Sequence, residues 1–226
     1  MKYSDTTFMG YRRSDGQVGV RNYLGILSTV TCANQAAQDI ARHIDGTAAF
    51  THQQGCGQLQ SDLEIVRRTL INLGKNPNLG AVLVVSLGCE GVDGAQIAHE
   101  IAKTGKPVEL VKVQQEGGYF GALSEAGLKA QKMAAHISHF QREPVGIRHL
   151  RVGIKCGASD PTSGLASNPA VGKAVDRLIE AGGSAVFGET TEVIGAEHIL
   201  SQRCDGKAVA DKLLAAVDAL EARVRQ

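Results

Sequence analysis

Side chains that could do chemistry follow six segments that the sequence predicts as β-strands. These strands are expected at residues 24–30, 48–52, 81–86, 108–113, 150–154 and 184–187. The polar or reactive residues at their ends are Cys32, Asn34, His52, Cys56, Cys89, Glu90, Gln114, Gln115, Lys155, Cys156, Ser159, Asp160, Glu189 and Glu192. Ligands of open parallel sheets bind outside the carboxyl ends of the strands. We therefore expect these residues to contribute to a single site.

Four of the five cysteines fall at these predicted strand ends, whereas Cys204 lies near a helix end. The four are Cys32, Cys56, Cys89 and Cys156. Their long separations and the absence of C-x-x-C argue against a zinc ribbon or a ferredoxin-type cluster. They could line a site or bind a metal as thiolates. The alternative is that each is a small buried apolar residue.

An imidazole and a thiol lie close together in His52-Gln53-Gln54-Gly55-Cys56-Gly57. Both groups can bind a transition metal. A nucleophilic Cys–His pair is a rival interpretation. A thiol-redox role for Cys56 is a third, and it predicts an exposed thiol with a lowered pKa.

Carboxylates follow two of the predicted strands. Glu90 could be a general base or a metal ligand, or it could interact with a helix dipole. Glu189, Glu192 and Glu197 precede His198 after the last strand. Carboxylates with imidazole suit Fe(II), Mn(II) or Mg(II). The alternative is a solvated, acidic start of a helix.

Lys155 begins the densest polar group, which continues through Asp160. A lysine at a strand end can pair with a substrate carboxylate, or act as a base if its pKa is lowered. Gly157 would let the backbone approach a ligand closely. Neither G-x-x-x-x-G-K-[ST] nor G-x-G-x-x-G is present, so a nucleotide phosphate site is poorly supported.

Strands and helices alternate along the chain, which predicts an α/β fold with a mostly parallel sheet, Rossmann-like and three-layered. Ser61-x-x-Glu64 is expected to form a capping box, and Asp93 to cap the next helix. Residues 1–21 are expected to form an N-terminal arm, and residues 22–226 an α/β domain. Residues 141–149 contain Pro144 and Gly146, and could divide that domain into two α/β halves.

Composition restricts the function classes. The 226 residues are 43% hydrophobic and 21% charged, with a net charge of +1, no Trp and 4% aromatics. Nucleic-acid binding is not expected without a basic stripe or stacking aromatics. No apolar run reaches the ~18 residues that suggest a membrane span. Five cysteines without a secretion signal indicate a reducing compartment, so we expect a cytoplasmic protein.

Ordered motifs over nearly the whole chain resemble the altronate/galactarate dehydratase family of sugar-acid dehydratases. The stretches that carry the resemblance include Gly10-Tyr11-Arg12-Arg13-Ser14-Asp15-Gly16, Thr31-Cys32-Ala33-Asn34, His52-Gln53-Gln54-Gly55-Cys56-Gly57, Gly88-Cys89-Glu90, Gln115-Glu116-Gly117-Gly118, Lys155-Cys156-Gly157-Ala158-Ser159-Asp160 and Glu189-Thr190-Thr191-Glu192. The family also contains a sulfolactate sulfo-lyase.

This resemblance implies that a hydroxy acid loses water through α-proton abstraction and β-elimination, with Fe(II), or Mn(II) or Mg(II), as cofactor. An iron–sulfur cluster is the alternative cofactor. The implied catalytic residues are His52, Glu90, Lys155, Ser159 and Asp160. Those implied for substrate binding are Arg21, Asn34, Gln114, Gln115, Gly117 and Gly118. The implied metal ligands are His52, Cys56, Cys89, Cys156, Glu189 and Glu192.

The same resemblance implies partners. A small N-terminal domain or separate subunit and a further C-terminal domain are expected outside this chain, which we expect to form a homo-oligomer. Two alternatives remain. A sulfolactate sulfo-lyase would perform a similar β-elimination. A non-catalytic interface domain would instead use the polar strand ends to contact another domain.

Overall fold

The computed structural model describes residues 5–155, 157 and 160–225. The chain divides into two compact units, Met1–His149 and Leu150–Gln226. This division lies at the end of the 141–149 segment.

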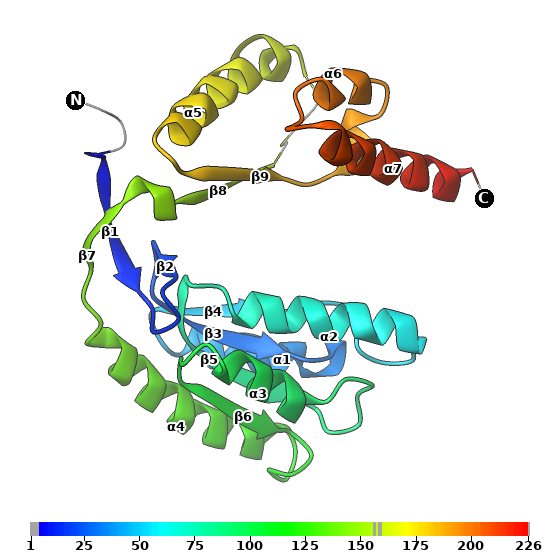
Figure 1. Ribbon diagram of the computed structural model, residues 1–226. Helices are drawn as coiled ribbons and strands as arrows, with labels where there is room; N and C mark the ends of the chain where they lie inside the picture. Colours follow the sequence, from blue (N-terminus) through cyan, green and yellow to red (C-terminus); the bar gives the residue numbers. More distant parts are fainter. Residues whose placement is uncertain (1–4, 156, 158–159, 226) are drawn as a thin grey trace. The chain divides into compact units, whose positions relative to one another are not determined.

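A four-stranded parallel sheet forms the centre of the first unit, in the order β4 (Thr47–Phe50), β3 (Tyr23–Ser28), β5 (Leu79–Ser86) and β6 (Val108–Lys112) (Figure 1). Every residue of β5 is buried. Such a continuous apolar run is typical of a parallel strand covered on both faces. The predicted α/β class and parallel sheet are confirmed.

Two helices cover each face of this sheet. On one face, α1 (Asn34–Arg42) and α4 (Tyr119–Ser138) pack on inward-facing residues of β3 and β5 such as Leu24 and Leu83. On the other face, α2 (Gln60–Gly74) and α3 (Gly94–Ala102) pack on the alternate residues, such as Leu27 and Val84. Side chains of successive strand residues point to opposite faces, so one sheet supports two cores.

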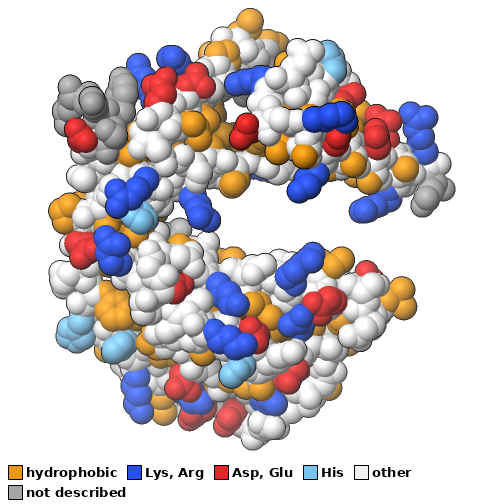
Figure 2. Space-filling model, in the orientation of Figure 1, with side chains coloured by type: hydrophobic (Ala, Val, Ile, Leu, Met, Phe, Trp, Pro, Cys, Tyr) orange, Lys and Arg blue, Asp and Glu red, His pale blue; other side chains and the backbone are white. Residues whose placement is uncertain are grey.

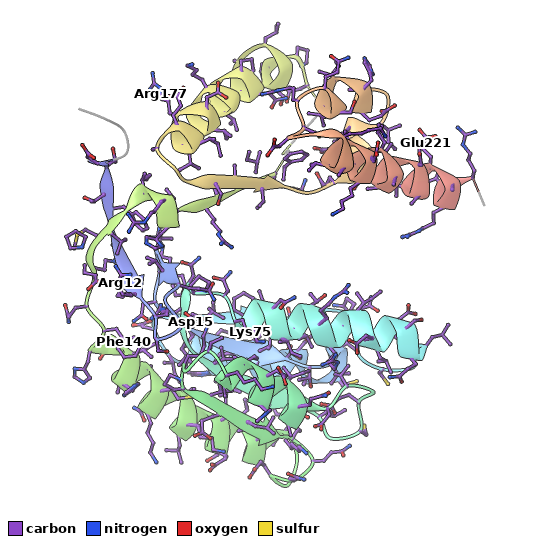
Figure 3. All side chains as sticks on the ribbon, in the orientation of Figure 1. Arg12, Asp15, Lys75, Phe140, Arg177 and Glu221 are labelled. Atoms are coloured by element: carbon purple, nitrogen blue, oxygen red, sulfur yellow. The ribbon has the colours of Figure 1, made fainter. Side chains whose placement is uncertain are left out.

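Within residues 5–21, which were expected to be an arm, the chain forms two β-strands. β1 (Thr7–Arg12) pairs antiparallel with both β2 (Val18–Gly19) and β7 (Glu143–Gly146). The short turn η3 (Ile147–His149) follows β7. Figure 3 labels Arg12 on β1 and Phe140 ahead of β7. Arg13 joins this small sheet to the rest of the unit, because its guanidinium donates to Pro77 O at 2.8 Å and Asn22 Oδ1 at 2.9 Å.

The second unit is built on two parallel strands, β8 (Arg151–Ile154) and β9 (Ser184–Phe187). The turn η4 (Ser163–Ser167) and α5 (Asn168–Glu180) connect them, and η5 (Thr190–Val193), α6 (Glu197–Ser201) and α7 (Lys207–Val224) follow. Among its described residues only Ala181 and Val217 are buried apolar side chains, whereas Val186 and Phe187 are 60% and 62% exposed. Two strands alone rarely bury enough surface for stability.

The helix starts test two expectations. Asp93 caps α3 as predicted, accepting a hydrogen bond from Ala95 N at 2.9 Å. The capping-box prediction is wrong. α2 begins at Gln60 after Leu59, with no side-chain cap, and Glu64 instead accepts from Arg67 Nε at 2.8 Å. No helix in the described part of the chain has the length and apolarity to cross a bilayer.

Candidate functional site

The strand order of the first unit is the kind that, in α/β proteins, is associated with a ligand-binding crevice at the carboxyl edge of the sheet. The chain leaves β3 towards β4 on one side, and leaves β5 towards β6 on the other. The loops after β3 and β5 therefore diverge, as they do at the switch points where α/β proteins bind ligands. Glu90 and His52 lie at this edge.

The Glu90 carboxylate links the ends of β3 and β5. Its Oε1 accepts from Thr29 Oγ1 at 2.6 Å, from Leu87 N at 3.2 Å and from Ser86 Oγ. Its Oε2 accepts from Gly88 N at 2.5 Å. Four donors from the ends of two strands and the loop after β5 thus converge on one side chain.

These contacts determine the ionisation of Glu90. Partial burial raises the pKa of this carboxyl. Hydrogen bonds from Ser86, Thr29 and the loop backbone lower it by a larger amount, so the pKa lies below the ordinary value. A carboxylate with a lowered pKa is a weaker base. In this geometry Glu90 holds two loops together. Its catalytic and ligand roles remain predictions.

His52 is also hydrogen-bonded through both ring nitrogens. Nε2 lies 3.1 Å from Ser28 O, and Nδ1 lies 3.2 Å from Gln54 N. A carbonyl only accepts and an amide only donates, so these partners assign the proton to Nε2. Asn34 supports the arrangement, since its Nδ2 donates to His52 O at 2.7 Å. Both side chains connect the end of β4 to its neighbours, and neither His52 nitrogen is free for a metal in this conformation.

Three loops at this edge contact one another and each carries an exposed thiol. Thr31 N donates to Gln54 O at 3.0 Å, and Gly91 N donates to Gly55 O at 3.0 Å. Cys32, Cys56 and Cys89 lie on these loops, and all three are free and exposed. The alternative that they are buried apolar residues is therefore wrong for these three.

The loop after β6 completes the edge. Gln114 N donates to Leu87 O at 3.0 Å, and the Gln114 side chain packs against Gly88. Gly117 and Gly118 have φ values of 76° and 95°, which favour glycine, and they lead into α4 with no side-chain cap. Gln114 therefore joins this group, and Gln115 and both glycines lie on the same loop.

Arg21 does not belong to this group. It precedes β3, and its backbone N lies 3.1 Å from Asn78 Oδ1, just before β5 begins. Both strands start there, so Arg21 lies at the amino edge of the sheet, opposite the crevice. Arg21 precedes its strand, whereas the other expected site residues of this unit follow theirs, so the two kinds of residue lie at opposite edges of the sheet.

An apolar groove of about 490 Å³ adjoins the crevice, between β4 and α2. Phe50, Ile65, Val66 and Leu73 are among its lining residues, and His52 and Gln54 lie at one end. Its walls are mostly apolar, so they suit apolar groups rather than a polyhydroxy acid.

The second unit has its own strand-end pair. Lys155 follows β8 and Glu189 follows Gly188 after β9, and Lys155 Nζ lies 2.8 Å from Glu189 Oε1. Glu189 has a φ of 63° and a ψ of 70°, the only left-handed non-glycine among the described residues. Strained backbone of this kind clusters at functional sites. The hydrogen bond from Lys155, and then one with Glu192, holds the pKa of the Glu189 carboxyl below its ordinary value.

The other expected site residues of the second unit differ in their surroundings. Asp160 accepts from the Thr162 hydroxyl, from Thr162 N at 2.8 Å and from Ser163 N at 3.1 Å, so it caps the following turn. These hydrogen bonds, the one from the Thr162 hydroxyl first, lower the pKa of its carboxyl. Glu192 N donates to Glu189 O at 2.9 Å. Cys156 and Ser159 lie outside the described residues.

The expected metal ligands do not assemble within the described part of the chain. No group of three or more His, Cys, Asp or Glu side chains there could hold a metal ion. The contacts that do form, Lys155 with Glu189 and hydroxyls and amides with Glu90, give these carboxylates partners other than a metal ion. Among the described residues the donor set that the resemblance implies is not formed, and the metal itself stays a prediction.

Sequence reasoning missed Thr29 and Ser86. Both are buried polar residues at the ends of strands, and both donate to Glu90. A hydroxyl at the last position of an apolar strand is a weak signal. It gains meaning only once the pairing of β3 with β5 brings the two ends together.

Two family models of known proteins match this chain. A family model described as D-galactarate dehydratase/altronate hydrolase, second domain, matches residues 10–138, more than half of the chain. The chain belongs to this family. A second model, D-galactarate/altronate dehydratase, C-terminal, matches residues 147–226. That match falls in the chain, whereas the sequence led us to expect the C-terminal domain beyond it.

Individual relatives agree. A (2R)-sulfolactate sulfo-lyase subunit beta from Chromohalobacter salexigens is 40% identical over 224 residues, which cover 99% of this chain and 57% of that protein. An altronate dehydratase from Bacillus subtilis is 36% identical, and a galactarate dehydratase (L-threo-forming) from Escherichia coli is 33% identical. Each alignment covers 92% of this chain and 44% of the relative. The chain thus spans about half the length of these relatives.

Proposed function

We propose that this chain is part of a sugar-acid dehydratase, a lyase that removes water from a hydroxy acid. Family membership carries this proposal, together with relatives that are named dehydratases and a sulfo-lyase. In the reaction a base takes the proton α to the carboxylate. The electron pair forms a carbon–carbon double bond, and the β-hydroxyl leaves as water after it is protonated.

The Lys155–Glu189 pair is suited to the first step. Removing an α-proton places negative charge on the substrate carboxylate, which a nearby ammonium stabilises. Lys155 is 69% exposed in its side chain and so is accessible to a carboxylate. We infer that the substrate carboxylate takes the place of Glu189 beside Lys155.

This exchange would activate Glu189. The hydrogen bond from Lys155 is the largest cause that lowers the pKa of Glu189. When the ammonium turns to the substrate, that cause weakens and the pKa of Glu189 rises, which makes it a stronger base. Glu189 is therefore our candidate for the group that takes the α-proton, and Lys155 for the carboxylate partner.

The first unit contributes a second polar surface at the crevice. We propose that the four-stranded sheet and its two helical layers are Rossmann-like, because the order β4-β3-β5-β6 has a switch point between β3 and β5. Gln114 and the exposed thiols of Cys56 and Cys89 would line it. Fe(II) remains a prediction for this family, and no step here depends on it.

A sulfolactate sulfo-lyase is the second candidate. The sulfo-lyase subunit from C. salexigens aligns with 99% of this chain at 40% identity, more than either dehydratase described above. Loss of sulfite from a carbon β to a carboxylate follows the same α-proton abstraction. The roles of Lys155 and Glu189 would be the same in both reactions, so substrate choice alone separates the candidates.

We also propose that the second unit is covered in the working enzyme. Its exposed Val186 and Phe187 are apolar, and large apolar patches mark interaction sites. The relatives are about twice as long as the aligned region, and one of them is a subunit. A further domain or a small partner subunit would supply the cover.

The experiment is a substrate panel on the protein expressed from its own gene. Altronate, galactarate and sulfolactate are offered separately, and the keto acid and sulfite products are measured. We expect turnover of one of them, and a loss of at least about tenfold in kcat/KM on Lys155→Met, the size of ~1.4 kcal/mol. Lys207→Met is the matched control, since Lys207 pairs with Asp211 at 2.9 Å on α7. No turnover of any substrate, or equal activity of both variants, would contradict the proposal.

A further inference from the structure

Three arginines gather at the amino edge of the four-stranded sheet, the edge opposite to Glu90 and His52. They come from distant parts of the chain, since Arg13 follows β1, Arg21 precedes β3 and Arg142 precedes β7. Arg21 and Arg142 are exposed, whereas Arg13 is partly buried. The lyase reaction proposed above uses none of the three.

The two exposed arginines share one backbone oxygen. Arg21 Nη1 donates to Val20 O at 3.3 Å, and Arg142 Nη2 donates to the same atom at 3.4 Å. Both distances exceed the usual N–H···O separation of about 2.9–3.0 Å, so both hydrogen bonds are weak. Because both nitrogens reach the same oxygen, they are close enough for one oxyanion to contact both. A neutral carbonyl thus stands where an anion could pair with two guanidinium groups.

The third arginine adds positive charge next to this oxygen. Arg13 Nη2 donates to Arg21 O at 3.0 Å, one residue after the shared carbonyl. The guanidinium groups of Arg13 and Arg142 both lie over the Tyr11 ring, 5.5 and 5.2 Å from its centroid. Like charges held this close repel one another, and a bound anion would relieve the repulsion.

The carboxylates nearest in sequence to these arginines have other hydrogen-bond partners. Glu143 pairs with Arg12 at 2.6 Å, and Asp15 accepts from Gln17 N at 3.0 Å and from Gln17 Nε2 at 2.9 Å. Figure 3 labels Arg12 and Asp15 in this part of the first unit. Within the described part of the chain, neither of the two exposed arginines forms an ion pair. Their charge is therefore available to a ligand.

The backbone beneath the shared oxygen is held in place by side chains. Asn78 Oδ1 accepts from Val20 N at 2.8 Å and from Arg21 N at 3.1 Å, and Arg13 Nη1 donates to Asn22 Oδ1 at 2.9 Å. A rigid support reduces the entropy that is lost on binding. Guanidinium groups also offer parallel N–H donors, the geometry that recognises carboxylates and phosphates.

We propose that Arg21 and Arg142 bind a doubly charged oxyanion, either a phosphoryl group or a dicarboxylate. The anion takes the guanidinium groups from Val20 O and bridges them, and Arg13 adds its charge from the adjacent backbone. Arg142 leads into β7 of the small antiparallel sheet, and Arg21 leads into β3 of the parallel sheet. Binding therefore links the two sheets of the first unit and stabilises their folded arrangement.

The test is a titration of the full chain with inorganic phosphate, at an ionic strength held constant with chloride. Calorimetry should show saturable binding, and the midpoint of thermal unfolding should rise with it. Arg21→Gln and Arg142→Gln should each weaken the affinity at least about tenfold, because each removes a charged hydrogen-bond donor. Arg68→Gln is the matched control, since Arg68 is exposed on α2 and the change in charge is the same. That variant should bind phosphate as the wild type does.

Malonate, titrated in parallel, separates the two sources of the anion. Binding of phosphate alone indicates a phosphoryl compound, and binding of malonate alone indicates a dicarboxylate. Arg21→Lys and Arg142→Lys keep the charge but lose the planar fork, so we expect intermediate affinities. If neither probe changes the heat or the midpoint relative to chloride, the inference is overturned. It also fails if binding survives in the variant that carries both Gln substitutions, because the anion would then lie elsewhere.

Discussion

Replacing Glu90 by Gln tests whether this carboxylate holds the ends of β3 and β5 together. The amide is nearly isosteric, and its oxygen can still accept from Thr29 and Ser86. Its NH₂ group would face Gly88 N, where the carboxylate accepts at 2.5 Å. The hydrogen bond from Gly88 N to a charged acceptor is lost, and two donors, Gly88 N and the new side-chain NH₂, face each other. Such bonds contribute ~1.5–3 kcal/mol each, so we expect a loss of about 2–3 kcal/mol in the free energy of unfolding.

The assay is urea unfolding at pH 7, with Glu109→Gln as the control. Glu109 lies 3.5 Å from Lys129 and its side chain is 50% exposed. Exposed pairs contribute ~0–1 kcal/mol, so that variant should hardly change. The pKa of Glu90 is lowered in the folded state, so its contribution is present at neutral pH and is lost as the pH falls through the folded pKa. The difference between wild type and Glu90→Gln should therefore shrink in acid. Equal losses for both variants would refute this reasoning.

Two other residues give further predictions. Burial lowers the pKa of Lys106 to about 8, while its Nζ donates to Gly74 O and Asn76 O at 2.9 and 2.8 Å. The unfolded chain then binds more protons between about pH 8 and pH 10.5. The free energy of unfolding should rise with pH there by up to ~3 kcal/mol, and Lys106→Met should abolish this rise in thermal or urea unfolding. Gly55→Ala should cost ~1–3 kcal/mol in the same assay, because φ is 101° and the new Cβ would lie 2.6 Å from Thr29 O. An unchanged midpoint would contradict this.

The sequence could predict the sheet because its signal is local. Apolar runs such as the one that forms β5 are bounded by turns, and all six expected strands occur within a few residues of their predicted limits. The position of Cys32, Cys56 and Cys89 after strands also followed from the sequence, whereas their exposure did not, because burial as small apolar residues was the alternative. Which residues then meet depends on pairing between distant strands, and the sequence does not contain that information in any local pattern.

Three residues show this limit. Glu90 was interpreted as a general base, a metal ligand or a partner of a helix dipole, but one of its hydrogen-bond donors, Thr29, lies 61 residues away in the sequence. His52 looked like a ligand until the pairing of β4 with β3 brought its ring to Ser28 O. Glu64 matched a capping box, yet an arginine three residues later offered a charged partner, and the N-cap of α2 is Leu59, two residues before Ser61.

Figure 2 shows charged and apolar side chains intermixed on the visible surface, so charge alone does not reveal a site. The functional account depends instead on a chemical step, the removal of the α-proton. Substrate deuterated at the carbon α to the carboxylate tests this step directly when the product is analysed by mass spectrometry. We expect the product to lose the deuterium to solvent, and Glu189→Gln to slow its loss and turnover together. A product that keeps all of its deuterium would contradict the account, because the eliminated proton would then come from another carbon.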